Sequence, residues 1–267
     1  VSILEKTTLR IFFNKITIAI CLLLALSCSK DKDEPIIVGD GVTKDLNKKP
    51  TGSSANDFLA ATNYTSLVIE IVYVDGFKPN TASIQNLKTF LETRLNKPNG
   101  ITIIEKKIPA LGLAPYSNDD LVLVEDTFRS YYNNQSILSL YVFFADGGSQ
   151  EDTSNSFVLG TAYRNTSFVI YEDTILNNTG GLGQPSRTNL ETVVMLHEIG
   201  HLLGLVDLGS SMQTPHSDST HAKHCNNENC LMFWKTETGD VFDSLLGGNI
   251  PDLDTNCIND LQANGGK

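Results

Sequence analysis

The segment 197–204 restricts the fold and chemistry of this chain more than any other, because it contains His197, Glu198, His201 and Gly204. Two histidines four positions apart lie about one turn apart on one face of an α-helix, so both imidazoles can bind one metal ion. Glu198 follows the first histidine and can act as a general base towards a metal-bound water molecule. Gly204 lets the chain leave the helix in a left-handed conformation. The segment therefore predicts a helical zinc site with a hydrolytic carboxylate.

The residues around this motif have the pattern of a buried helix. Pro185 and the pair Thr188 and Glu191, which has the spacing of a capping box, mark a helix start upstream. Polar side chains on a mostly apolar helix need partners, because burying them unpaired costs free energy. A metal ion would be such a partner; a buried helix with hydrogen-bonded histidines is the alternative. The apolar positions are Leu190, Val193, Val194, Leu196, Ile199, Leu202 and Leu203.

A second block downstream contains His224, Cys225, Cys230 and Met232 in the order His-Cys-x4-Cys-x-Met. Together the two blocks resemble the metzincin clan of metallopeptidases, in particular the archaemetzincin pattern. The chain is also similar, over most of its length beyond residue 50, to lipoprotein metalloproteases of Bacteroidetes-type bacteria. The resemblance implies a zinc peptidase in which Met232 forms a turn beneath the metal. Trp234 stands where several metzincins have a tyrosine, so that hydroxyl group is missing here.

The third metal ligand has two main candidates. The position that usually supplies it in the clan, three residues after the glycine, holds Asp207, and some metzincins do use aspartate there. His224 is the alternative suggested by the archaemetzincin pattern, and it requires the loop 207–223 to return to the metal. His221 is a further candidate. Zinc accepts imidazole nitrogen and carboxylate oxygen alike, so both readings stay open at this point.

The three cysteines outside the N-terminal segment also allow two readings. The resemblance implies a second, structural zinc ion to which Cys225 and Cys230 contribute, but only Cys257 follows them, so a histidine such as His216 or His221 would complete the site. The alternative is one disulfide among the three cysteines, which an oxidising compartment would favour.

The first 27 residues have the pattern of an export signal. Basic residues precede an apolar run, 16–26, that is too short for an ordinary membrane span. The run ends at Cys28 in a sequence that resembles a bacterial lipobox, which implies a lipidated cysteine. An ordinary signal peptide and an uncleaved anchor are alternatives. We therefore expect a protein of the bacterial cell envelope, lipid-anchored to the outer membrane and either periplasmic or surface-exposed.

The chain divides into a signal peptide (1–27), a flexible tether (28–57) and one catalytic domain (58–267). The membrane is a predicted partner through the lipid anchor. The formal net charge of −11 argues against nucleic acid as a partner.

Hydrophobic periodicity predicts an α+β domain with a mixed, metzincin-like sheet, packed helices, a long zinc-binding helix and a C-terminal helical part. The resemblance implies that residues 158–164 form an edge strand that binds an extended peptide; an ordinary sheet strand is the alternative. We expect strands at 67–74, 101–108, 137–145, 157–163 and 167–171, and helices at 83–95, 119–132, 240–246 and 251–263, besides the motif helix.

The predicted function is a zinc-dependent endopeptidase that hydrolyses extracytoplasmic proteins or peptides, with Glu198 as general base. Two other functions stay open. One is a non-proteolytic surface-binding module that keeps the fold, against which the intact Glu198 argues. The other is a zinc hydrolase of a non-peptide bond, which the motif does not exclude.

Overall fold

The computed structural model describes residues 43–154 and 156–267. The predicted signal peptide, Cys28 and the tether up to residue 42 lie outside these described residues. Within the described part, none of the helices combines the length and the apolar composition that crossing a bilayer requires.

A five-stranded sheet forms the centre of the fold, in the order β2-β1-β3-β5-β4. Neighbouring strands from β2 to β5 run parallel, and β4 is antiparallel to β5 at the edge of the sheet. The predicted mixed sheet is therefore confirmed. The strands are β1 (Ser66–Val74), β2 (Ile101–Ile108), β3 (Ile137–Phe144), β4 (Gly160–Arg164) and β5 (Ser167–Ile170).

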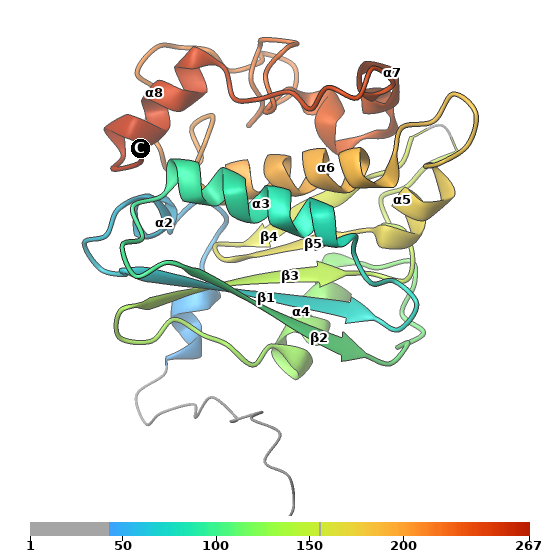
Figure 1. Ribbon diagram of the computed structural model, residues 1–267, viewed down its shortest axis with the longest axis horizontal. Coiled ribbons are helices and arrows are strands. Elements are labelled where there is room, and N and C mark those ends of the chain that lie inside the picture. The colour runs from blue at the N-terminus through green and yellow to red at the C-terminus, as the bar shows by residue number, and fades with distance from the viewer. Residues whose placement is uncertain (1–42, 155) are drawn as a thin grey trace, which may run out of the picture. The chain divides into compact units, whose positions relative to one another are not determined.

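Helices cover both faces of the sheet (Figure 1). Helices α3 (Thr81–Arg94) and α6 (Arg187–Leu202) lie on one face, and α4 (Asn118–Phe128) lies on the other. Strand β1 contributes side chains to the hydrophobic cores on both faces of the sheet, because successive side chains of a strand point to opposite faces. Its Ile69 and Ile71 belong to the core beneath α3 and α6, and Val72 and Val74 pack in the core shared with α4.

The folded part begins earlier than the sequence predicts. Short helices η1 (Lys44–Asn47) and α2 (Ala55–Leu59) belong to it. Asn47 is fully buried, and its amide donates to Asn133 Oδ1 (2.8 Å) and Thr166 Oγ1 (3.0 Å). The predicted boundary at residue 58 is therefore too late. Polar composition indicates a tether, but here hydrogen bonds of polar side chains attach the segment, together with the buried apolar residues of α2.

Helix α6 begins at a different cap from the predicted one. Ser186 is the N-cap, and its hydroxyl accepts a hydrogen bond from Asn189 N (3.2 Å). Glu191 does not close a capping box with Thr188, because its carboxylate is fully buried and forms an ion pair with Arg187 at 2.5 Å. The helix ends as predicted, with Gly204 in the left-handed region at φ 76°.

The C-terminal segment lies over the side of α6 that faces away from the sheet (Figure 1). Helix α6 is therefore enclosed between the sheet and this segment, and all of its residues from Leu190 to Leu202 are buried. The segment contains η2 (Trp234–Glu237), η3 (Gly239–Val241), α7 (Phe242–Leu245) and α8 (Thr255–Ala263), and another short helix, α5 (Glu172–Asn177), precedes α6.

Candidate metal centre

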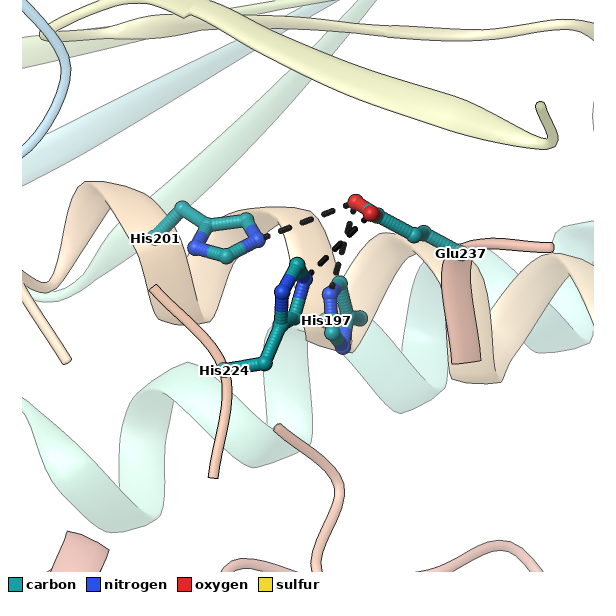
Figure 2. Close-up of side chains that lie close together, drawn as sticks. All are labelled: His197, His201, His224 and Glu237. Carbon is teal, nitrogen blue, oxygen red and sulfur yellow. Dashed lines mark ion pairs between the residues drawn. The ribbon is translucent and has the colours of Figure 1, made fainter. Parts of the chain in front are cut away.

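Three imidazoles from two parts of the chain meet above helix α6. His197 and His201 project from one face of the helix, and His224 approaches on the loop that follows it (Figure 2). The ring of His224 lies 5.3 Å from each of the other two rings, and these two are 4.8 Å apart, measured between centroids. We call these three residues the histidine centre. One ligand atom from each of them and from Glu237 lies within 4.8 Å of the others.

The histidine centre has the hydrogen bonding that a metal site requires. His197 Nδ1 lies 2.8 Å from the carbonyl oxygen of Leu231, so the proton on this nitrogen leaves Nε2 free to bind a cation. His197 Nε2 and both ring nitrogens of His224 are buried without a hydrogen-bond partner. Burial, together with the charge of His197, holds the pKa of His201 well below its usual range, which favours the neutral imidazole. These residues fit a zinc ion.

Glu198 lies beside the histidine centre in a fully buried position, and neither carboxylate oxygen has a hydrogen-bond partner. Gly160 on β4 provides the space, because a Cβ atom there would lie 2.9 Å from Glu198 Cγ and 2.7 Å from Val194 Cγ1. Burial, followed by the negative charge of Glu237, raises the pKa of Glu198 well above its ordinary value. A bound dication would counteract this effect and favour the carboxylate.

Met232 packs beneath the histidine centre. It is fully buried, and its carbonyl accepts a hydrogen bond from Cys225 N (2.8 Å), which places it in a turn. A Cβ atom at Gly200, between the two helix histidines, would lie 2.3 Å from Met232 Sδ. The glycine therefore permits the close packing of this methionine against the helix.

Two of the candidate ligands lie away from the histidine centre. Asp207 is exposed, has a positive φ of 67°, and does not belong to either group of metal-binding side chains found among the described residues. His221 is partly exposed and stacks on Trp234 with 4.2 Å between ring centroids. The structure thus brings His224, and neither of these two, to His197 and His201.

A cavity of about 210 Å³ opens next to the histidine centre. Strand β4 forms one wall, and the N-terminal segment reaches the same cavity through Thr51, whose hydroxyl donates to the carbonyl of Ala162 (3.1 Å). The lining residues are Thr51, Thr161, Ala162, Glu198, His201, Leu208, Lys223, His224 and Glu237.

A second group of metal-binding side chains lies in the C-terminal segment. His216, Cys225, Asp254 and Cys257 each offer a ligand atom within 4.8 Å of the others, and Cys230 lies beside Cys257. We call His216 and the three cysteines the cysteine centre. Cys225 Sγ lies 3.4 Å and Cys257 Sγ 4.0 Å from His216 Nδ1, and Cys230 Sγ lies 3.6 Å from Cys257 Sγ. Ligands of a tetrahedral zinc ion with Zn–S bonds of about 2.3 Å stand at comparable separations.

The surroundings of the cysteine centre favour one thiolate, at Cys230, and an oriented imidazole, whereas hydrogen bonding within the group raises the pKa of Cys225 and Cys257. Hydrogen bonds from Cys225 and Cys257 are the main reason that the pKa of Cys230 is lowered to about 4, and the backbone N–H groups of Asp254 and Met232 also donate to its sulfur. Nε2 of His216 lies 2.8 Å from a carboxylate oxygen of the fully buried Asp260, which leaves Nδ1 towards the sulfurs.

None of the three cysteines of this centre forms a disulfide in the structure; all three are free and buried. The 3.6 Å between Cys230 Sγ and Cys257 Sγ is far longer than a bonded S–S distance of about 2.05 Å. The disulfide expected as one alternative is thus not formed in the structure.

Three residues of these sites were not predicted from the sequence. Glu237 joins the histidine centre from η2, Asp254 is grouped with His216, Cys225 and Cys257, and Asp260 supports His216 from α8. None of the three has a motif of its own, because loop conformation alone sets its distance from the other ligands.

No family model matches the chain, and no curated protein matches it. Among solved structures, an archaemetzincin from Methanopyrus kandleri is 18% identical, with a TM-score of 0.48, and the match covers 75% of this chain and 96% of that one. Metalloproteinase-II from Bacteroides fragilis is 16% identical, with a TM-score of 0.38, and the match covers 84% of this chain and 59% of that one. Any function therefore has to be argued from the residues of the two centres themselves.

Proposed function

We propose that the protein is a zinc-dependent endopeptidase whose catalytic metal is bound by His197, His201 and His224. One observation carries the proposal: the histidine centre has buried imidazole nitrogens without hydrogen-bond partners, next to the equally unpaired carboxylate of Glu198. Unpaired buried polar atoms are expensive, so their concentration at one point is best explained by a ligand that satisfies them. Asp207 is not part of this centre, and we assign it no role in metal binding.

The side chains around the centre have distinct roles in this proposal. A bound zinc ion would acidify a water molecule and polarise the scissile carbonyl group. Glu198 accepts the proton of the attacking water and delivers it to the leaving amine. Strand β4 lies at the edge of the sheet, so its backbone can pair with an extended peptide and hold the bond near Glu198. Met232 packs under the centre without touching the substrate.

We propose that the cysteine centre binds a second, structural zinc ion. All four of its side chains are buried, and Asp260 orients the imidazole of His216. A closed set of four protein ligands is typical of structural zinc, whereas catalytic zinc keeps one position for water or substrate.

We also propose where the enzyme acts. The export pattern and Cys28 support a lipid-anchored enzyme of the bacterial envelope that cleaves extracytoplasmic proteins or peptides.

The proposal is tested by metal analysis and cleavage assays on the purified protein and a Glu198→Gln variant. We expect two zinc ions per chain in both proteins, and cleavage of a peptide library by the parent protein alone. Glu228→Gln, which changes an exposed carboxylate on the C-terminal segment, is the matched control and should cleave normally. Zinc binding without Glu198-dependent cleavage of any peptide would instead indicate a binding module, and absence of zinc at the histidine centre would overturn the proposal.

A further inference from the structure

Glu237 occupies a position in the histidine centre that the proposed reaction does not use. Its Oε2 atom lies 3.7 Å from Nε2 of His197 and 3.9 Å from Nε2 of His201, and its Oε1 atom lies 3.3 Å from Nε2 of His224. Figure 2 shows the three rings directed at this one carboxylate from the opposite side. The carboxylate thus stands where the three imidazoles converge.

These distances are those between ligands of one metal ion. Ligand atoms bound tetrahedrally at 2.0–2.1 Å stand about 3.4 Å apart, which is close to the separations of Glu237 from the imidazoles. The two distances to the helix histidines are longer than an ordinary N–H···O hydrogen bond of about 2.9 Å. Simple pairing of a carboxylate with imidazoles would bring the atoms closer, so the arrangement matches a fourth vertex around a cation.

The backbone fixes Glu237 at this place. Its carbonyl oxygen accepts a hydrogen bond from Leu159 N (2.9 Å), and Thr238 forms an antiparallel bridge with Val158. A Cβ atom at Gly239 would lie 2.5 Å from the ring of Phe157, so the next residue is also packed closely. Glu237 is therefore attached to the chain immediately before β4, and its side chain does not project from a free loop.

The same location puts Glu237 in the path of a substrate. A peptide that pairs with the edge of β4 must lie along Gly160 to Ala162, between the backbone contact of Glu237 and the hydroxyl of Thr51. The cavity there measures about 210 Å³, smaller than the roughly 300–1,000 Å³ of typical ligand sites. The Glu237 side chain is 29% exposed, against at most 10% for the three histidines, so it is the member of the group with room to move outward.

We infer that Glu237 is a fourth protein ligand of the histidine centre in the free protein, and that a peptide substrate must displace it before hydrolysis. The inference rests on the proposed metallopeptidase function. It makes the resting enzyme a closed form, in which the position needed for catalysis is taken by the chain itself. Substrate binding along β4 and release of Glu237 are then coupled, because both involve the backbone around Leu159.

A protein ligand that blocks a metal position can be distinguished from a residue that only orients the other ligands. Its removal weakens zinc binding, because one bond is lost. The same removal strengthens the binding of any external ligand that competes for that position. The apparent affinity of such a ligand is reduced by the fraction of protein in which the position is free, so a position more than 90% closed implies a gain of about tenfold when it is opened. A residue that only orients the histidines would change both affinities in the same direction.

The experiment measures two affinities in Glu237→Ala and Glu237→Gln, with the zinc-loaded protein as reference. Chelator competition gives the zinc affinity of the histidine centre, and His197→Ala identifies which zinc ion belongs to that centre. Calorimetry gives the affinity for acetohydroxamate. We expect zinc to bind at least about tenfold more weakly and acetohydroxamate about tenfold more tightly. Asp240→Asn, an exposed carboxylate three residues along the chain, should change neither.

The outcomes separate this inference from the proposed function. If both affinities fall together, or if neither changes, Glu237 is not an internal ligand, while a His197-dependent zinc still supports the metallopeptidase. If His197→Ala loses no zinc, both ideas are overturned. The glutamine variant guards against a folding defect in the alanine variant, since its amide fills the same volume.

Discussion

The histidine centre and the cysteine centre share the loop that follows α6, yet they differ in features that distinguish a catalytic from a structural metal site. The histidine centre joins a rigid helix to a loop, opens to a cavity, and has an unpaired carboxylate beside it. The cysteine centre is buried, and its imidazole is oriented by Asp260. Adjacent residues, His224 and Cys225, serve different centres. Access of one metal position to a cavity, and not ligand chemistry alone, therefore distinguishes the two centres.

The largest effect should come from removing the ligand that the loop contributes. We expect His224→Ala to lose the zinc of the histidine centre and to reduce peptide cleavage at least about 10³-fold, because the metal supplies several kcal/mol of transition-state stabilisation. Asp207→Ala is the matched control and should retain both. Metal analysis and kcat/KM measurements on both variants test whether His224 is the third ligand. A loss of zinc in Asp207→Ala would instead assign that role to Asp207.

Removing a ligand of the cysteine centre should affect stability more than chemistry. We expect Cys257→Ser to lose one zinc equivalent and at least about 3 kcal/mol of the free energy of unfolding, since binding to a structural site contributes directly to folding. Cleavage by the protein that stays folded should continue. Denaturant unfolding and thiol titration test this, and a parent protein with two thiols in a disulfide would contradict it.

A smaller effect is expected where the helix meets the methionine. Gly200→Ala places a Cβ atom 2.3 Å from Met232 Sδ, and such overpacking costs about 1–3 kcal/mol. The strain lies between His197 and His201, so zinc affinity of the histidine centre should fall while the cysteine centre keeps its zinc. Thermal unfolding with and without chelator measures both. An equal loss of zinc affinity at both centres would show that the strain at Gly200 spreads to the cysteine centre.

The last effect concerns how the free energy of unfolding depends on pH through Glu172, at the start of α5. Burial and the charge of Glu191 raise the pKa of Glu172 to about 9, although Arg187 opposes the shift. The folded protein therefore binds a proton that the unfolded chain releases near pH 4.3, and stability falls as pH rises from 5 to 8, by at most about 1.4 kcal/mol per pH unit.

We expect Glu172→Gln to reduce this slope, because the amide does not titrate. Glu228→Gln, at an exposed site, should leave the slope unchanged. Urea unfolding at several pH values, with zinc held in excess, provides the comparison. A slope that is the same in all three proteins would show that Glu172 is ionised in the fold.

Local patterns predicted much of the fold. The strand at 101–108 has the expected bounds, and the strand at 137–145 and the helix at 83–95 differ from the structure by one or two residues at their ends. These elements have clear periodicity, so the prediction needed no tertiary information. The start of α6 was predicted at the wrong cap because Glu191 pairs with Arg187 and accepts a hydrogen bond from the Ser83 hydroxyl on another helix.

By itself, the sequence determined the pair His197 and His201 with Glu198 between them, because helix geometry places residues four apart on one face whatever surrounds them. Only the tertiary structure decided that His224 and not Asp207 joins them, that Glu237 completes the group, and that His216 meets Cys225 and Cys257. Those residues lie on loops whose conformation depends on long-range packing and hydrogen bonds. Residue spacing along the sequence therefore does not predict which loop residues reach each centre.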